Sequence, residues 1–143
     1  MLSIAITRLA YDQLLGYCQK SLPQEACGVL AGEAATPDSP AVVTHIYDIS
    51  NVHEEPLRSF RFHPEEWISA YYGIQKNRQS LVGFFHSHPT SSAVPSTRDW
   101  LGLPVSDDSI SYWIISMQGS PAAVVQPFRM DGQTFRPLVL MLT

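Results

Sequence analysis

The sequence has few cysteines, no excess of basic residues and no long apolar run. Two cysteines, Cys18 and Cys27, are too few for a disulfide framework, so we expect reduced thiols. Nine Lys and Arg against thirteen Asp and Glu give a net charge of −4, which disfavours nucleic-acid binding. No apolar run approaches the ~20 residues that span a bilayer, and the first residues, MLSIAITRLAYD, lack the pattern of a signal peptide. We therefore expect a cytoplasmic protein that binds neither nucleic acid nor membrane.

The length and the pattern of elements predict one α+β domain over residues 1–143. Helices are expected at 8–21 and 64–77, with a short one at 96–101. Strands are expected at 2–6, 27–31, 42–49, 60–62, 81–88, 112–117, 123–129 and 134–142. Thr7 can cap the first helix, Pro64 suits the first turn of the second, and Asp131-Gly132 is a hairpin signal. Because strands outnumber helices without alternating with them, a mixed or antiparallel sheet with packed helices is favoured.

The most informative stretch begins with two histidines at the end of an expected strand. Side chains two apart on a strand share one face, so His86 and His88 can lean onto one ion. Pro89 ends the strand, and a turn of the chain can bring Asp99 alongside them. Two imidazoles and a carboxylate are a familiar ligand set for catalytic zinc, with a fourth position left for water. Bound zinc lowers the pKa of that water to roughly 7.

Simpler interpretations stand beside this one. The two histidines could be half-buried residues that hydrogen-bond to backbone. Ser96 and Asp99 also match a helix-capping pattern, which is compatible with Asp99 as a metal ligand. A hydrolase of this type further needs a carboxylate base and an oxyanion donor. Ser96 could supply the donor, whereas the base must come from elsewhere. Cys27 lies in an apolar run and is more typical of a small core residue than of a nucleophile.

At these residues the sequence resembles the JAMM metallopeptidases, also called MPN+ or Mov34/MPN/PAD-1. Their pattern is a glutamate, then H-x-H, seven residues and S-x-x-D. Here His86-x-His88 is followed by seven residues and then by Ser96-Thr-Arg-Asp99, and Pro23-x-Glu25-x-Cys27-Gly28 is similar to the family's glutamate segment. The resemblance covers nearly the whole chain. It implies a cytidine-deaminase-like fold of the JAB1/MPN type, one zinc ion held by His86, His88 and Asp99, Glu25 as acid/base, and Ser96 at the oxyanion.

The resemblance also implies a class of substrate. Small stand-alone bacterial members act on ubiquitin-like sulfur-carrier proteins, cleaving the peptide or isopeptide bond after a C-terminal Gly-Gly in sulfur transfer, cysteine or cofactor biosynthesis. A Gly-Gly tail can lie extended in a narrow groove, whose expected walls here are residues 51–57 and 103–108. The chain could form a homodimer. Two alternatives stay open: a non-catalytic interaction scaffold of the same fold, and a relative of the DNA-repair branch, which the charge of −4 disfavours.

Overall fold

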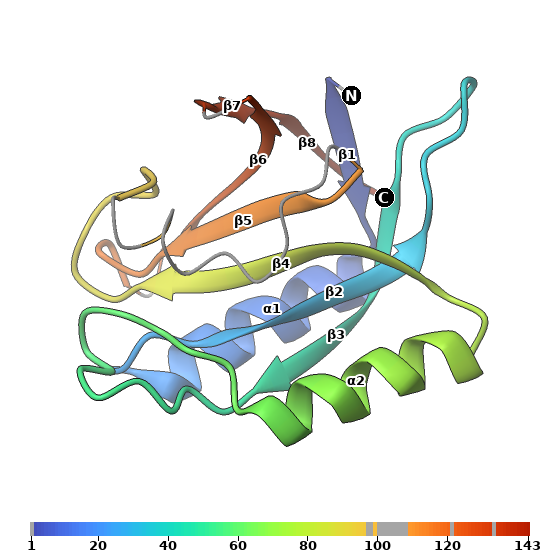
Figure 1. Cartoon of the computed structure of the whole chain (residues 1–143). Coiled ribbons are helices and arrows are strands. Elements are labelled where there is room, and N and C mark those ends of the chain that lie inside the picture. The colour runs from blue at the N-terminus through green and yellow to red at the C-terminus, as the bar shows by residue number, and fades with distance from the viewer. Residues whose placement is uncertain (1, 97–98, 100–108, 121, 133) are drawn as a thin grey trace.

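The computed structural model describes residues 2–96, 99, 109–120, 122–132 and 134–143. Two helices and eight strands follow one another in this part of the chain (Figure 1): β1 (Ser3–Ile6), α1 (Arg8–Ser21), β2 (Cys27–Glu33), β3 (Val42–Ile49), α2 (Pro64–Lys76), β4 (Ser80–His88), β5 (Ser111–Ser116), β6 (Val124–Asp131), β7 (Thr134–Pro137) and β8 (Val139–Leu142). The α+β class expected from the sequence is confirmed. Among the described residues, no helix is both long and apolar enough to cross a membrane.

All eight strands form one mixed sheet in the order β7-β6-β5-β4-β2-β3-β1-β8. The pairs β1–β3, β1–β8 and β4–β5 are parallel, and the other neighbours are antiparallel. The two outer strands are separated in sequence only by Leu138, whose N–H donates to Pro127 O of β6. Val139 N–H, the next donor along the chain, reaches Leu2 O beside β1. The sheet therefore curls until its two edges approach each other.

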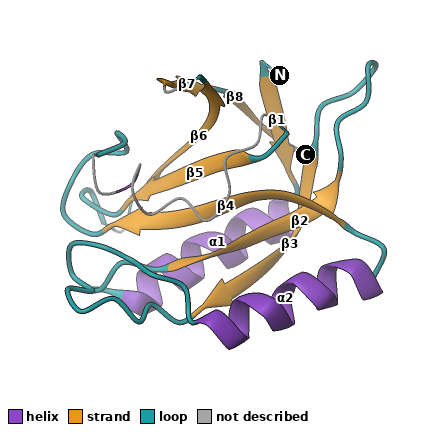
Figure 2. Ribbon diagram, in the orientation of Figure 1, coloured by secondary structure: helices purple, strands orange, loops and turns teal. Residues whose placement is uncertain are grey.

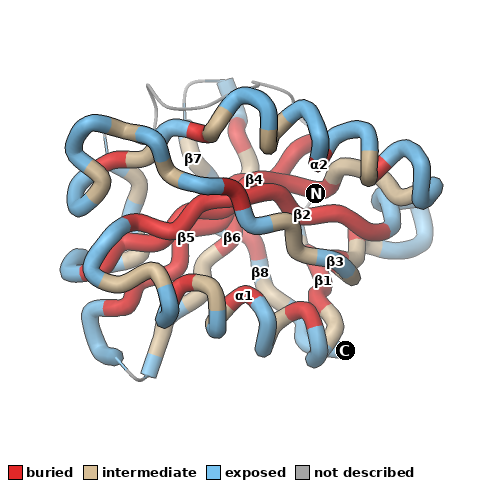
Figure 3. The backbone as a smooth tube through the Cα atoms, turned by 90° about the horizontal axis from the view of Figure 1, so that it is seen from below, coloured by how far each residue is buried: buried red, intermediate tan, exposed pale blue. Residues whose placement is uncertain are grey.

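The two helices cover opposite sides of the central strands (Figures 2 and 3). In α1 the Thr7 hydroxyl accepts a hydrogen bond from Ala10 N–H, the N-cap contact that its position predicts. Ala10, Leu14 and Cys18 recur at helical spacing and are buried against the sheet. The N-cap of α2 is His63, whose ring nitrogen accepts from Glu66 N–H, and Pro64 occupies the first turn.

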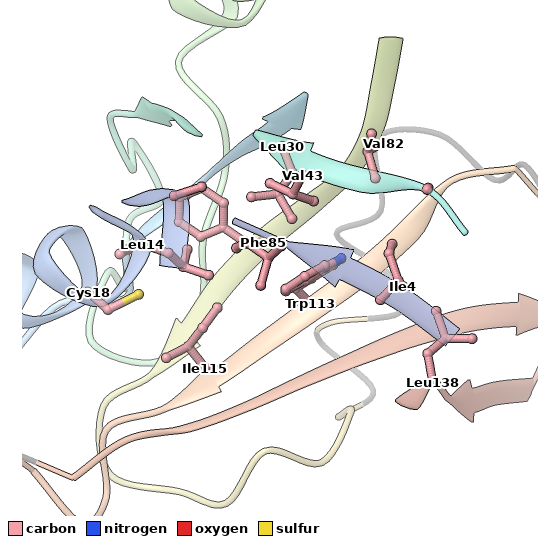
Figure 4. Close-up of a cluster of buried hydrophobic side chains, with 14 of the residues drawn as sticks. Ile4, Leu14, Cys18, Leu30, Val43, Val82, Phe85, Trp113, Ile115 and Leu138 are labelled. Atoms are coloured by element: carbon pink, nitrogen blue, oxygen red, sulfur yellow. The ribbon is translucent and has the colours of Figure 1, made fainter. Parts of the chain in front are cut away.

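Each sheet face carries its own buried cluster. On the side of α1, Phe85, Trp113 and Ile115 pack with the helix residues and with β1 (Figure 4). On the side of α2, Val29, Phe84 and Tyr112 pack with Phe62, Ala70 and Ile74. Alternation along β4 divides its residues between the two clusters, with Phe84 on one face and Phe85 on the other. The residues of β4 that continue the Phe84 face are His86 and His88.

Two expectations about strands were wrong. Residues 60–62 do not form a strand: Phe62 makes only an isolated bridge with Asn51. The rings of Phe60 and Phe62 are held by side-chain packing instead: Phe60 stacks on His86, and Phe62 packs against Phe84. The single strand expected at 134–142 is two strands broken at Leu138, because the chain changes strand partner there from β6 to β1. The helix expected at 96–101, apart from residues 96 and 99, and the groove wall expected at 103–108 lie outside the described residues.

Candidate metal centre

The C-terminal end of β4 and the segment that follows it bring three potential ligands together. His86 and His88 lie on the same face of β4, as the i, i+2 spacing predicts, with their Nε2 atoms 3.2 Å apart. Asp99 Oδ1 is 2.8 Å from His86 Nε2, and Asp99 Oδ2 is 3.1 Å from His88 Nε2. All three residues are buried, and one ligand atom from each lies within 4.8 Å of the others. This arrangement is compatible with a metal site.

The charges in this cluster suit a divalent cation. Burial would raise the pKa of Asp99, but hydrogen bonds from His86 and His88 dominate and hold the pKa well below its ordinary value. Burial lowers the pKa of His86, so this ring is neutral near pH 7. An ionised carboxylate and a neutral imidazole offer lone pairs, which is the protonation state that a metal ion requires of its ligands. The chemistry of the donor set therefore fits zinc.

Contacts around the ligands fix their orientation. His88 Nδ1 lies 2.8 Å from Ser92 O, so this nitrogen carries a proton and donates it, which turns Nε2 toward Asp99. Burial lowers the pKa of His88, but its hydrogen bonds with Asp99 and Ser92 and the charges of Asp99 and Glu25 together raise it. The ring of Phe60 stacks on His86 with the centroids 4.6 Å apart and an interplanar angle of 22°.

Asp99 is oriented by a capping-box pair of hydrogen bonds with Ser96. Ser96 N–H donates to Asp99 Oδ2 at 2.7 Å, and Asp99 N–H donates to the Ser96 hydroxyl at 3.1 Å. The capping pattern and the ligand position expected from the sequence therefore occur together. Because Ser96 Oγ acts as an acceptor here, its own O–H can still donate to another group.

The structure brings Glu25 to the same cluster. Cys27 pairs with His86 in the antiparallel β2–β4 ladder, so the chain two residues earlier runs toward His88. Ala26 continues this pairing: its N–H donates to Ser87 Oγ at 2.8 Å, and Ser87 N–H donates to Ala26 O at 2.9 Å. Glu25 is only 5% exposed, and its charge helps to raise the pKa of His88. A buried carboxylate thus lies beside the imidazole pair.

Cys27 is adjacent to the cluster but has the environment of a core residue. Its thiol donates to Ile49 O at 3.3 Å, and the residue is 2% exposed. Burial, followed by the charges of Glu25, Glu66 and Asp48, raises the pKa of this thiol to about 12. Such a group is protonated at neutral pH and is a poor nucleophile. Both cysteines are free and buried.

Three residues that shape the site were not assigned to it from the sequence: Phe60, Ser87 and Asn51. Ser87 lies on the face of β4 opposite the two histidines, and its hydrogen bond with Ala26 could not be foreseen. Phe60 was placed in a strand and instead covers the ring of His86. Asn51 begins the loop expected as one wall of the groove, and its side chain donates to Glu25 O at 3.1 Å. No motif in the sequence marks these three positions.

The chain is similar to known proteins in sequence and in fold. The family model described as prokaryotic homologs of the JAB domain matches residues 8–130. A solution structure of a protein from Desulfitobacterium hafniense is 29% identical and superposes with a TM-score of 0.86, covering 98% of this chain and 92% of that one. A crystal structure of a JAB1/MPN domain protein from Archaeoglobus fulgidus, 15% identical, has a TM-score of 0.63 and covers 99% of this chain and 98% of that one. This second likeness supports the expected JAB1/MPN fold.

Two curated proteins are also similar in sequence. A desampylase from Haloferax volcanii is 37% identical over 94 residues, which are 63% of this chain and 65% of that protein. A "probable TtuB-protein conjugate cleaving protease" from Thermus thermophilus is 26% identical over 98 residues, which are 68% of this chain and 62% of that protein. The matched part therefore spans a little under two thirds of each relative.

Proposed function

Because the chain belongs to the family of prokaryotic homologues of the JAB domain, we propose that it is a zinc-dependent peptidase acting on conjugates of a ubiquitin-like protein. The observation that carries this proposal is the buried convergence of His86, His88 and Asp99, with the carboxylate residue Glu25 beside His88. Structural scaffolds have no need for three ligand side chains and a further acid in one buried cluster. A peptidase needs all four.

The names of the two curated relatives support the kind of substrate. One is a desampylase, and the other is named for cleaving protein conjugates of TtuB. We extend this to a bond that follows the C-terminal Gly-Gly of a ubiquitin-like sulfur-carrier protein, in either peptide or isopeptide form. Glycine has no side chain, so such a tail can approach the buried ligands along the loop that follows Asn51. The free thiols fit a cytoplasmic location, and a homodimer, which light scattering would test, stays a prediction.

Each site residue has one role in this proposal. Zinc, held by His86, His88 and Asp99, would supply Lewis-acid activation of water and of the scissile carbonyl. Glu25 accepts the proton that the attacking water loses and passes it to the leaving amine, which departs neutral. Ser96 donates a hydrogen bond from its hydroxyl to the oxyanion that develops on the carbonyl oxygen. The hydrogen bond from His88 Nδ1 to Ser92 O holds that ring in the tautomer that binding requires.

The test combines metal analysis with one substitution. We expect elemental mass spectrometry to find one zinc per chain. We also expect the protein to cleave a carrier that has residues appended after Gly-Gly, which intact-mass measurement of the carrier would detect. Glu25→Gln should retain the zinc and lose about 10²–10⁴-fold in cleavage rate, because the amide cannot accept the proton. Full activity in this variant, or after exhaustive chelation, would refute the proposal. A protein that binds the carrier but holds no metal would favour the non-catalytic scaffold.

A further inference from the structure

The side chain of Asn51 is at the centre of a hydrogen-bond network next to Glu25. Its Oδ1 accepts from His53 N–H at 3.0 Å and from Arg61 N–H at 3.1 Å. Its Nδ2 donates to Ser59 O at 2.9 Å and to Glu25 O at 3.1 Å, with a longer contact of 3.5 Å to Pro56 O. Two donors and two acceptors use the full capacity of a carboxamide. Only one orientation of the amide satisfies them, since the oxygen faces N–H groups and the nitrogen faces carbonyls.

This network joins two parts of the candidate site that are distant in sequence. One part is Glu25, whose carbonyl Asn51 holds and whose N–H donates to Pro56 O at 2.8 Å. The other is the segment from residue 51 to residue 61, whose beginning and end are joined because Asn51 Oδ1 accepts from both His53 N–H and Arg61 N–H. Phe60, near the end of that segment, stacks on the ring of His86. One side chain thus connects the backbone of the proposed base to the loop that covers a proposed ligand.

The opposite side of the Glu25 segment is fixed by β4. There Ser87 holds both backbone groups of Ala26. The peptide that carries Glu25 is therefore clamped between a strand, which is part of the sheet, and a loop, which is not. The strand side is supported by the whole β2–β4 ladder. The loop side consists of the Asn51 contact and the hydrogen bond from Glu25 N–H to Pro56 O. Asn51 also holds Pro56 O and Ser59 O, so its loss should loosen both contacts and let Glu25 move.

We propose that Asn51 is a positioning residue that acts on the reaction through Glu25. The inference rests on the proposed role of Glu25 as the base. A purely structural anchor would make the protein less stable without changing the chemical step selectively. A positioning residue should lower kcat with little change in KM, because a base displaced by about 1 Å can cost roughly 10²-fold in rate.

The activity test uses a ubiquitin-like carrier whose Gly-Gly terminus is joined to a fluorescent lysine peptide. We expect Asn51→Ala to lower kcat at least about tenfold, with KM within about twofold and zinc content unchanged. Asn51→Asp should lose as much, because a carboxylate oxygen would face the carbonyls of Glu25 and Ser59. Ile74→Val, a change in the α2 core, is the control for lost stability and should leave kcat within about twofold.

A double variant tests whether Asn51 acts through Glu25. In the Glu25→Gln background, Asn51→Ala should reduce the residual rate by less than twofold, because the group it positions is already gone. An equal tenfold loss in both backgrounds would overturn the inference, as would a kcat loss no larger than that of Ile74→Val.

Amide hydrogen exchange of the metal-free protein tests the same link without any activity. The Glu25 amide should exchange faster in both Asn51 variants, because its segment is released from the loop. The His53 and Arg61 amides should exchange faster only in Asn51→Ala, since Asp retains an acceptor for them. An unchanged Glu25 amide in both variants would overturn the inference. If the wild-type protein cleaves no carrier while these exchange rates change as expected, the proposed function fails and the structural link stands.

Discussion

Replacing Ser87 with alanine should destabilise the protein without disturbing the proposed metal site. Ser87 is fully buried, and its hydroxyl accepts a hydrogen bond from Ala26 N–H at 2.8 Å. Alanine would leave that buried N–H without its acceptor, which costs about 1–3 kcal/mol. The entropy of unfolding scales with length and is about 0.3 kcal/mol per kelvin for a chain of this size, so Tm should fall by roughly 3–10 °C. The histidines lie on the other face of β4, so zinc content should stay unchanged.

The assay is thermal unfolding by circular dichroism, paired with elemental analysis of the same samples. Ser69→Ala on the exposed face of α2 is the matched control and should stay within about 0.5 kcal/mol of wild type. A Ser87→Ala protein that melts within 1 °C of wild type, taken as about 0.3 kcal/mol, would show that the Ala26–Ser87 contact contributes little. Loss of zinc from a well-folded Ser87→Ala protein would refute the assignment of opposite faces.

Two further predictions concern the glycines Gly28 and Gly16 and the two buried cysteines. Gly28→Ala would place a Cβ within 3.0 Å of Tyr47 O and of the Phe85 ring, so the free energy of unfolding, measured with denaturant, should fall by at least about 1–3 kcal/mol. Gly16→Ala, in open space on α1, is the control and should raise it by about 0.5–1 kcal/mol. Equal effects of the two substitutions would contradict this. Burial raises the thiol pKa values of Cys18 and Cys27 to about 12, so only about one part in 10⁴ of each thiol is ionised at pH 8. Iodoacetamide should therefore leave the native protein unmodified and active, whereas both cysteines of the unfolded protein should react. Rapid labelling of the native protein would show that the thiols are accessible.

The elements that the sequence predicts correctly are those with local signals. Thr7 marks the start of α1 because its hydroxyl needs only the N–H three residues ahead. The β-branched run at 42–49 becomes β3 with the expected bounds. Residues 60–62 also alternate like a strand, yet the local pattern misleads there. Their neighbours are the ring of His86 and the α2-side core, which are contacts that local periodicity does not encode.

The curl of the sheet could not be predicted for a related reason. The sequence predicts one strand from Thr134 to Leu142. Pro137 is a signal for an interruption within it, but it does not indicate that the chain changes strand partner there. The break arises because the chain leaves β6 and joins β1, which is more than 130 residues away in sequence. Only the packing of the whole sheet decides which partner each half of this segment takes.

The candidate site divides in the same way. The grouping of His86, His88 and Asp99 could be predicted because each constraint is short-range. His86 and His88 are two apart on one strand, and Asp99 is three from Ser96, with which it exchanges hydrogen bonds. The carboxylate that accepts the hydrogen bond from Ser96 N–H also faces both imidazoles, so this local hydrogen bond helps to orient Asp99 toward the histidines. This is why the S-x-x-D spacing carries chemical information even in a single sequence.

Asn51 illustrates the opposite situation. Its partners are 2, 5, 8, 10 and 26 residues away, and every one is a backbone group, so no residue type elsewhere reveals the network. A backbone partner leaves no mark in a sequence, because every residue carries a carbonyl and nearly every residue an N–H. The side chains that bind a metal can therefore be recognised by their identity. The side chains that support such a site through backbone groups become visible only in the folded chain.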